Sequence, residues 1–391
     1  MRIELPAYAL DVIRCLEANG FEAFVVGGCV RDSLMGVEPG DWDVCTSATP
    51  EEMQRCFAGY RVIETGLKHG TLTVRSHGEN VEITTYRLDG EYKDHRRPEK
   101  VEFVRKLELD LMRRDFTVNA MAYSPQAGLI DLFGGQDDLR SRVIRCVGSA
   151  QTRFEEDALR LLRALRFAAR FDFSIEPTTS AALWAKADLM AAIAAERIFV
   201  EWKKLLAAPA SRRILMEYAG LFEKWIPGLC ASRVQQMDFW DRLPPRADLR
   251  TGLLTDQPDI LCKALKTDAA FKNRVSRFVI CRDEPLPDSP TMVMRFLAAS
   301  GENAYEDRLD YARAREEDIR PCVTARRQAE AEGRVWKVED LAIGGHDLLE
   351  MGLKGPALGE MRKTLLEAVM KGRLPNEKNA LTDMARLLSE E

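Results

Sequence analysis

Residues 23–46 read AFVVGGCVRDSLMGVEPGDWDVCT, and this stretch decides the fold. An apolar run over 23–26 predicts a short strand, and two glycines separate it from a segment that begins like a helix. Glycines at such a turn let backbone amides approach a phosphate, and the helix N-terminus adds positive partial charge. Gly28 is therefore a candidate for nucleotide binding, and Arg31 could clamp phosphate oxygens. The same pattern is also typical of an ordinary tight turn between a strand and a helix.

Asp41 and Asp43 flank Trp42 near the end of this stretch. In a strand, residues i and i+2 point to one face, about 6.5–7 Å apart, so the two carboxylates would face the same way. Carboxylate oxygens are preferred ligands of Mg²⁺, and metals held there can activate an attacking hydroxyl and neutralise a leaving pyrophosphate. An isolated pair of aspartates at this spacing is usually an acidic turn. The glycine turn just upstream favours the alternative, in which Asp41 and Asp43 are catalytic metal ligands.

The next residues continue a mixed α/β pattern. The tetrad TPEE at 49–52 is typical of a helix start, with an N-cap, a proline and acidic residues in the first turn. The runs RVIETG, GTLTVRS and NVEITTYR predict strands, so we expect a sheet of about four or five strands. Glu82 is either a third carboxylate of the site or a solvent-facing strand residue. Residues 86–107 are polar and charged, which indicates a mobile loop, a weak hairpin or a solvated charge run.

The segment RRDFTVNAMA at 113–122 combines a basic pair, a carboxylate and an asparagine. These side chains could bind a sugar hydroxyl and a triphosphate, which makes Arg114 a candidate for nucleotide binding. The alternative is a charged N-cap region that opens a helix.

After Gly148 the pattern becomes helical, and one helix is predicted over 152–171. Asp157, Arg160 and Arg163 would share one side of it, where guanidinium donors and carboxylate acceptors could read the edge of a nucleotide base. An Asp–Arg pair on a solvated helix face would give the same pattern. The apolar residues form a stripe about 100° wide on the opposite side: Ala158, Leu161, Leu162, Leu165 and Ala169.

The composition limits the class of protein. Of 391 residues, 46% are hydrophobic and 30% are charged, which is typical of a globular chain. No run of about 18 uncharged apolar residues occurs and no signal peptide is evident, so we expect no membrane contact. Nine cysteines without a CxxC pair and only four histidines argue against zinc and disulfide sites and favour a reducing cytoplasm. The net charge of −5 does not indicate nucleic-acid binding, although a local basic patch would permit it.

Together these segments resemble the class II tRNA nucleotidyltransferases, the family of the CCA-adding enzymes. The resemblance is strong over about residues 20–205, with a weaker echo near 344–376. Cys29 and Trp42 differ from the residues usual at their positions, but Cys29 is small and Trp42 should face away from the metals. Seven motifs in sequence order carry the resemblance: GGCVRD, GDWDVCTSATP, VEITTYR, DHRRP, RRDFTVNAMAY, GLIDLFGGQDDL and FEEDALRLLRALRFAARF.

The resemblance implies an architecture and an activity. A mixed-sheet α/β nucleotidyltransferase head at 1–140 would be followed by an all-α neck at 141–205, which selects the base. An all-α body and tail at 206–391 would bind the acceptor end of tRNA. The implied reaction adds C, C and A to the tRNA 3′ end from CTP and ATP, with Mg²⁺ and without a nucleic-acid template.

The resemblance also implies roles for single residues. Asp41 and Asp43 match the metal-binding carboxylates. Asp157 and Arg160 match the pair that reads the Watson–Crick edge of the incoming base. The full set of positions that match nucleotide contacts is Gly28, Arg31, Arg114, Asp157, Arg160, Arg163 and Arg166.

Related activities remain as alternatives. The DHRRP loop resembles one that CC-adding members lack, which disfavours CC-only addition. An A-adding tRNA enzyme or a poly(A) polymerase shares the head and neck motifs, but the last 20 residues are not strongly basic, which disfavours the polymerase. A non-catalytic RNA-binding relative would not need two carboxylates beside a phosphate site. The residues do not indicate an oligomeric state.

Overall fold

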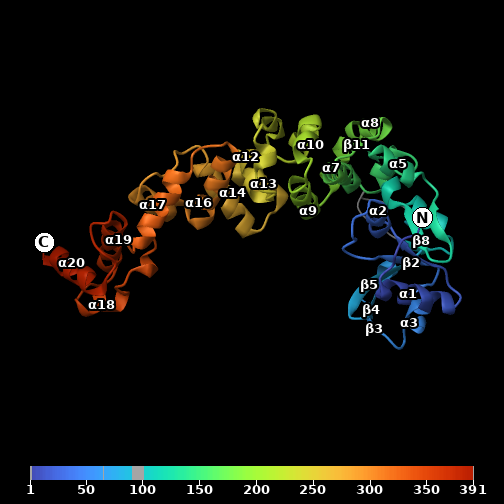
Figure 1. The fold of residues 1–391 in the computed structure, drawn as a ribbon, viewed down its shortest axis with the longest axis horizontal. Helices are drawn as coiled ribbons and strands as arrows, with labels where there is room; N and C mark the ends of the chain where they lie inside the picture. Colours follow the sequence, from blue (N-terminus) through green and yellow to red (C-terminus); the bar gives the residue numbers. More distant parts are fainter. Residues whose placement is uncertain (1, 65, 90–100, 391) are drawn as a thin grey trace. The chain divides into compact units, whose positions relative to one another are not determined.

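A computed structural model describes residues 2–64, 66–89 and 101–390 of the chain. These form two compact units, Met1–Pro227 and Gly228–Glu391, each of which is described by itself (Figure 1). The DHRRP loop at 94–98 lies outside the described residues.

Seven strands of the first unit form one sheet in the order β3-β4-β5-β2-β1-β8-β9. β2 and β5 run parallel and the other neighbours run antiparallel, so the sheet is mixed as predicted. It is larger than the expected four or five strands, because β8 and β9 add to the edge of β1. The strands are β1 Ala23–Val26, β2 Val44–Thr46, β3 Arg61–Ile63, β4 Thr71–Ser76, β5 Glu79–Thr85, β8 Met121–Ser124 and β9 Gly128–Asp131.

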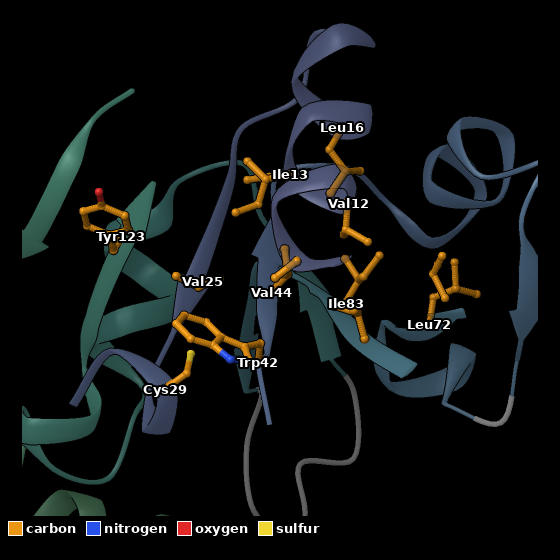
Figure 2. Packing of buried hydrophobic residues seen from close by; sticks show 14 of the residues in the cluster. Val12, Ile13, Leu16, Val25, Cys29, Trp42, Val44, Leu72, Ile83 and Tyr123 are labelled. Carbon is orange, nitrogen blue, oxygen red and sulfur yellow. The ribbon is translucent and has the colours of Figure 1, made fainter. Parts of the chain in front are cut away.

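Helix α1, Ala7–Ala18, packs on one face of this sheet and builds the main core (Figure 2). Its buried residues Val12, Ile13 and Leu16 belong to one cluster with residues of the strands, including Val44 and Ile83. Two short helices complete this part of the unit, α2 Gly28–Leu34 and α3 Pro50–Cys56. Helix α3 begins with a capping box, as the TPEE tetrad predicted.

A second, smaller cluster lies on residues that alternate with the first along β1 and β2. It joins Val26 and Cys45 of the sheet to Leu107 and Leu111 of α4, Leu107–Met112. Because side chains alternate between the faces of a strand, the sheet carries α1 on one face and α4 on the other. Strands β6 Arg87–Asp89 and β7 Val101–Phe103 pair antiparallel, so a hairpin-like pairing does exist within 86–107.

The remainder of the first unit is mostly helical. The short strands β10 Val143–Ile144 and β11 Ser174–Ile175 pair in parallel. The helices are α5 Gly135–Ser141, α6 Ala150–Glu156, α7 Leu159–Phe171, α8 Pro177–Ala185, α9 Ala195–Leu206, α10 Ser211–Glu217 and α11 Ala219–Trp225, with 3₁₀ turns at Leu67–His69, Thr117–Asn119 and Ala187–Ala192.

The expectation of one helix over 152–171 is wrong, because the chain leaves the helical conformation at Asp157. That residue has φ −136° and ψ 103°. Its carboxylate accepts a hydrogen bond from the backbone N–H of Leu159 at 3.1 Å, which favours a new helix start. The expected apolar stripe is nevertheless buried, from Ala158 through Ala169.

The second unit is described as helices and 3₁₀ turns, which agrees with the predicted all-α remainder. Four of its helices lie in 228–300, and residues 336–352 contain a 3₁₀ turn and a short helix. Among the described residues, no helix combines the length and apolar composition needed to cross a membrane. The helices are α12 Ala247–Leu253, α13 Pro258–Leu265, α14 Ala269–Cys281, α15 Pro290–Ser300, α16 Glu302–Ala314, α17 Arg320–Ala331, α18 Gly345–Glu350, α19 Pro356–Met370 and α20 Lys378–Glu390, with 3₁₀ turns at Ala231–Gln236, Trp240–Arg242 and Val338–Asp340.

Candidate active site

The two predicted catalytic aspartates lie immediately before strand β2. The backbone N–H of Val26 donates to the carbonyl oxygen of Asp43 at 3.0 Å, which attaches this segment to β1. Asp41 and Asp43 are exposed, whereas Trp42 is only 7% exposed and packs in the α1-side core with Cys29 (Figure 2). This alternation agrees with two carboxylates on one side of the strand and a tryptophan that faces away from them.

Glu82 occupies the corresponding position on the neighbouring parallel strand β5. Val44 pairs with Ile83, so Asp43 and Glu82 each lie one residue before a paired position. Glu82 is exposed between buried Val81 and Ile83, as the alternating pattern predicted. The register therefore brings a third acidic residue to the neighbourhood of Asp43.

The surroundings of Asp43 raise the pKa of its carboxyl group. Surrounding protein atoms, and then the negative charges of Asp41 and Glu82, raise the pKa of Asp43 to about 6, while Arg114 opposes the shift. Because Asp43 is solvent-exposed, a divalent cation could reach it and neutralise the repulsion between the carboxylates. Within the described parts of the chain, no three His, Cys, Asp or Glu side chains are arranged to hold a metal. Asp41 and Asp43 are the pair that could hold a cation, and the charge of Glu82 adds to the negative potential at Asp43.

The glycine turn places an arginine beside these carboxylates. Gly27 is the N-cap of α2 and has φ +79°, a backbone conformation that favours glycine. A Cβ atom on Gly27 would lie 3.0 Å from Nη1 of Arg114, whereas one on Gly28 would make only an ordinary contact with Arg31 at 3.6 Å. The steric requirement for glycine therefore falls on Gly27, and it is the close approach of Arg114 that imposes it.

Arg114 is held by the acidic residue one turn before it. Its Nη2 donates to Oδ2 of the buried Asp110 at 3.1 Å, and Asp110 also accepts from Nη2 of Arg113 at 2.7 Å. The Nε of Arg114 is buried without a hydrogen-bond partner among the described residues. An unsatisfied buried donor beside a glycine turn indicates that this position is prepared for an additional acceptor group.

Arg31 lies in the protein interior, in the helix that follows the glycine turn. Its side chain is buried, and its Nε donates to Oδ1 of Asp32 at 2.8 Å. Nη1 donates to Oδ1 of Asn119, and the guanidinium lies 4.6 Å from the ring centroid of Phe171. In this structure Arg31 therefore connects α2 to neighbouring elements and does not project into solvent.

Asp115 is the centre of a second polar cluster, between the RRD segment and the helices that follow. Its Oδ2 accepts from Nε and Nη2 of Arg163 at 2.9 and 2.6 Å, and its Oδ1 accepts from Nδ2 of Asn119 at 3.1 Å. Burial alone would raise the pKa of Asp115, but Arg163 and Asn119 hold it at about 2. Arg166 joins the cluster through Glu201: the Nε of Arg166 donates to Oε2 of Glu201 at 2.8 Å.

The backbone N–H of Arg160 donates to the carbonyl oxygen of Asp157 at 2.9 Å, but the two side chains have different partners and do not share the helix face expected from the sequence. The break after α6 turns Asp157 toward Arg197, whose Nη2 donates to Oδ2 at 2.9 Å. The Arg160 side chain is buried, and its Nη1 donates to Oε2 of Glu156 at 2.6 Å. Its Nη2 donates to the carbonyl oxygen of Arg113 at 2.8 Å, at the end of α4. Both predicted base-reading side chains are thus engaged with protein groups.

Two participants in these clusters, Arg197 and Glu201, were missed by the sequence reasoning. They belong to the segment AERIFVEWKKLL of α9, where Glu201 is buried among apolar residues. A carboxylate at an apolar position of a helical pattern is the signal that could have indicated a buried ion pair.

The sequence matches three family models in succession. The model described as "Poly A polymerase head domain" matches residues 23–145. A model described as "Probable RNA and SrmB- binding site of polymerase A" matches residues 172–232. A model of tRNA nucleotidyltransferase domain 2 matches residues 249–385.

Curated relatives and a solved structure match over the full length. A CCA-adding enzyme of Lacticaseibacillus paracasei is 35% identical, and the match covers 100% of both chains. One of Geobacillus kaustophilus is 38% identical, with 95% of each chain covered. The crystal structure of the Bacillus stearothermophilus CCA-adding enzyme in complex with CTP matches with a TM-score of 0.83 and 31% identity, covering 98% of this chain and 97% of that one. This chain therefore belongs to the CCA-adding enzyme family, the class II tRNA nucleotidyltransferases.

Proposed function

We propose that this chain adds C, C and A to the 3′ end of tRNA, using CTP and ATP and no nucleic-acid template. The observation that carries the proposal is the Asp41–Asp43 pair beside the Gly27 turn and Arg114, in a chain that matches CCA-adding enzymes from end to end. In the reaction, the 3′ oxygen of tRNA attacks the α-phosphorus of the nucleotide in line. One P–O bond forms as another breaks, and pyrophosphate leaves.

Asp41 and Asp43 are the residues that would hold a divalent metal, and we assign Mg²⁺ because carboxylate oxygens are its preferred ligands. The chemistry supplied by such an ion is activation of the attacking hydroxyl and neutralisation of charge on pyrophosphate. Arg114 holds a positive charge beside the glycine turn, where the triphosphate would lie. Gly28 offers its backbone N–H at the same turn.

Asp157 and Arg160 are proposed to select the base, with Arg163 and Arg166 as further nucleotide contacts. The carboxylate and guanidinium of this pair accept and donate hydrogen bonds that fit cytosine and adenine, and an ill-matched base would leave buried groups unpaired. Because Asp157 contacts Arg197 and Arg160 contacts Glu156, we expect base binding to exchange these partners.

The remaining parts of the chain have roles that follow from this activity. We propose a head at 1–140, a neck at 141–205 and a body and tail at 206–391 that recognise the acceptor end of tRNA mainly by shape. We propose a reducing cytoplasm as the working compartment, because the sequence has nine cysteines and no CxxC pair.

The test uses the purified protein, Mg²⁺ and three tRNA transcripts that end before CCA, after the first C and after CC. Each transcript receives CTP, ATP or both, and the products are separated on a sequencing gel. We expect addition that stops at CCA on all three transcripts.

Other outcomes would replace the proposal. Addition of A to the CC-ended transcript alone would identify an A-adding enzyme. A long untemplated run of A would identify a poly(A) polymerase. Absence of any incorporation would leave a non-catalytic RNA-binding relative.

A further inference from the structure

An ion pair outside the candidate active site joins the segment that follows β2 to the segment that precedes α4. Nη1 and Nη2 of Arg105 donate to Oε2 and Oε1 of Glu52 at 2.7 and 2.9 Å. The same Nη1 also donates to the carbonyl oxygen of Ser47 at 2.6 Å. The Arg105 side chain is 54% exposed but that of Glu52 only 19%, so the fork is shielded on its carboxylate side. Such a bidentate pair fixes geometry as well as charge.

Glu52 is rigidly attached to the turn that follows the catalytic strand. Its Oε2 accepts from the backbone N–H of Thr49 at 2.7 Å, and its own N–H donates to Oγ1 of Thr49 at 3.4 Å. The hydrogen bonds from Arg105 hold the pKa of Glu52 at about 2, so the carboxylate stays ionised at neutral pH. Arg105 is therefore anchored to residues 47–52, which directly continue from β2 and Asp43.

Arg105 itself lies two residues before α4. The backbone N–H of Val104 donates to the carbonyl oxygen of Tyr86, and the N–H of Tyr86 donates to that of Thr46, both at 2.8 Å. Leu107 and Leu111 of α4 pack in one cluster with Cys45 of β2. The apolar cluster opposes separation of α4 from the sheet. Hydrophobic contacts are non-directional, so the cluster alone does not fix the position of α4 along the face of the sheet. The ion pair adds a charged directional contact just before α4, beside the backbone hydrogen bonds of Val104 and Tyr86.

Displacement of α4 would change the position of Arg114 in the candidate active site. The helix carries Asp110, which holds Arg114, and Arg114 lies against Gly27 and lowers the pKa of Asp43. A shift of α4 relative to β2 would therefore change the distance between the triphosphate-binding arginine and the carboxylates.

We propose that Glu52 and Arg105 are positioning residues for nucleotidyl transfer, which hold α4 and thus Arg114 in place relative to Asp41 and Asp43. The inference rests on the proposed function. Without the ion pair, the nucleotide would still bind, but its α-phosphate would occupy a wider range of positions. Because in-line transfer requires close alignment of the reacting atoms, kcat should fall more than KM rises.

The test compares Arg105→Met with Arg105→Lys. The methionine keeps an apolar stem and leaves the capping box of Thr49 and Glu52 intact, while lysine restores the charge without the planar fork. The matched control is Arg140→Met, which removes an ion pair with Asp137 at a position where both side chains are 74% exposed. The measurements are kcat and KM for CTP with a tRNA that lacks CCA, together with Tm and tRNA affinity.

For Arg105→Met we expect a decrease in kcat of about tenfold and a change in KM for CTP below about twofold. Its Tm and tRNA affinity should match those of Arg140→Met, and Arg105→Lys should recover part of kcat. Glu52→Gln should lower kcat similarly, and combining it with Arg105→Met should add little, because both remove one interaction.

Three results would overturn the proposal: an unchanged kcat, a decrease fully explained by a lower fraction of folded protein, or additive effects of the two substitutions. The control for the proposed function is the wild-type protein itself. If the wild-type protein adds nucleotides and the Arg105 variants behave like Arg140→Met, the positioning role is wrong but the proposed function stands.

Discussion

At the scale of single residues, Gly27 shows how one backbone conformation makes room for a charged side chain. Gly27 and Gly36 both have positive φ, at +79° and +71°. An added Cβ would approach Arg114 at Gly27 but meets nothing within 4 Å at Gly36. Gly27→Ala should therefore raise KM for CTP by about tenfold or more, since it displaces a charged contact of the triphosphate. Gly36→Ala carries backbone strain without that displacement and should leave KM unchanged in steady-state assays. Equal KM values for CTP in the two variants would contradict a contact between Arg114 and the triphosphate.

Asp43 is the residue on which the metal assignment depends most directly. Asp43→Asn keeps the shape of the side chain but removes the charge needed to hold a divalent cation. We expect incorporation to fall by at least about 100-fold, because the metal contributes several kcal/mol of transition-state stabilisation. Binding of tRNA should change little. The control Asp137→Asn alters a carboxylate on the exposed surface of α5 and should keep full activity. Substantial activity of Asp43→Asn at saturating Mg²⁺ would contradict the assignment.

Asp115 links stability to pH. Its pKa falls from an ordinary value of 3.8 to about 2 in the folded protein, mainly because Arg163 opposes the effect of burial. A depressed pKa stabilises the fold above pH 3.8 and ceases to do so as the pH falls through the folded value. The shift corresponds to about 2 kcal/mol, lost between about pH 4 and pH 2. In urea unfolding, the stability difference between wild type and Asp115→Asn should shrink over that range. A difference that does not depend on pH would show that Asp115 is not ionised against Arg163.

At the scale of elements, the sequence predicted most of what local patterns control. Alternation identified β4 and β5 and the outward position of Glu82, and the TPEE tetrad identified the start of α3. Strand β8 begins within 113–122, which the sequence assigned either to nucleotide binding or to a charged N-cap region that opens a helix. Pairing with β1, a contact between distant parts of the chain, makes this segment a strand.

The break between α6 and α7 was missed for a related reason. The residues around Asp157 have good helix propensity and a continuous apolar stripe, so nothing local predicts an interruption. The interruption depends on Asp157 finding two partners, the backbone N–H of Leu159 and the guanidinium of Arg197. Arg197 lies 40 residues further along the chain, so sequence spacing could not reveal the pair. For the same reason the different side-chain partners of Asp157 and Arg160 were not predicted.

The interruption yields a prediction at this scale. Arg197→Met removes the charged partner of Asp157 but leaves the contact with Leu159. We expect Asp157 to be less fixed in orientation, so incorporation of UTP relative to CTP should rise by several-fold, measured as a ratio of kcat/KM values. Lys203→Met, a change in the last turn of the same helix, serves as the control and should keep the wild-type ratio. An unchanged ratio in Arg197→Met would show that Asp157 is oriented without Arg197.

At the scale of the whole molecule, the candidate chemistry lies in one of two compact units, and the other is described as helices and 3₁₀ turns. Every proposed site residue, from Gly28 to Arg166, lies within Met1–Pro227. The composition predicted an α/β head and a helical remainder, because strand and helix patterns differ along the chain. It did not predict a division after Pro227, because the helical patterns on either side of this position are alike.

The division predicts that the two substrates of the reaction can be separated. A fragment of residues 1–227 retains the sheet, the carboxylate pair, Arg114 and the Asp115 cluster, so it should fold cooperatively and bind CTP with an affinity near that of the full chain. It lacks the helices of 228–391, which we expect to supply much of the contact with tRNA, so its KM for tRNA should rise by at least about tenfold. Circular dichroism and CTP titration test folding and nucleotide binding, and filter binding tests tRNA. Introducing Asp43→Asn into the fragment is the matched control, and it should abolish any residual incorporation without changing the melting profile. If the fragment instead adds nucleotides with the KM for tRNA of the full chain, recognition of the acceptor end resides within the first 227 residues, and the role assigned to the body and tail is wrong.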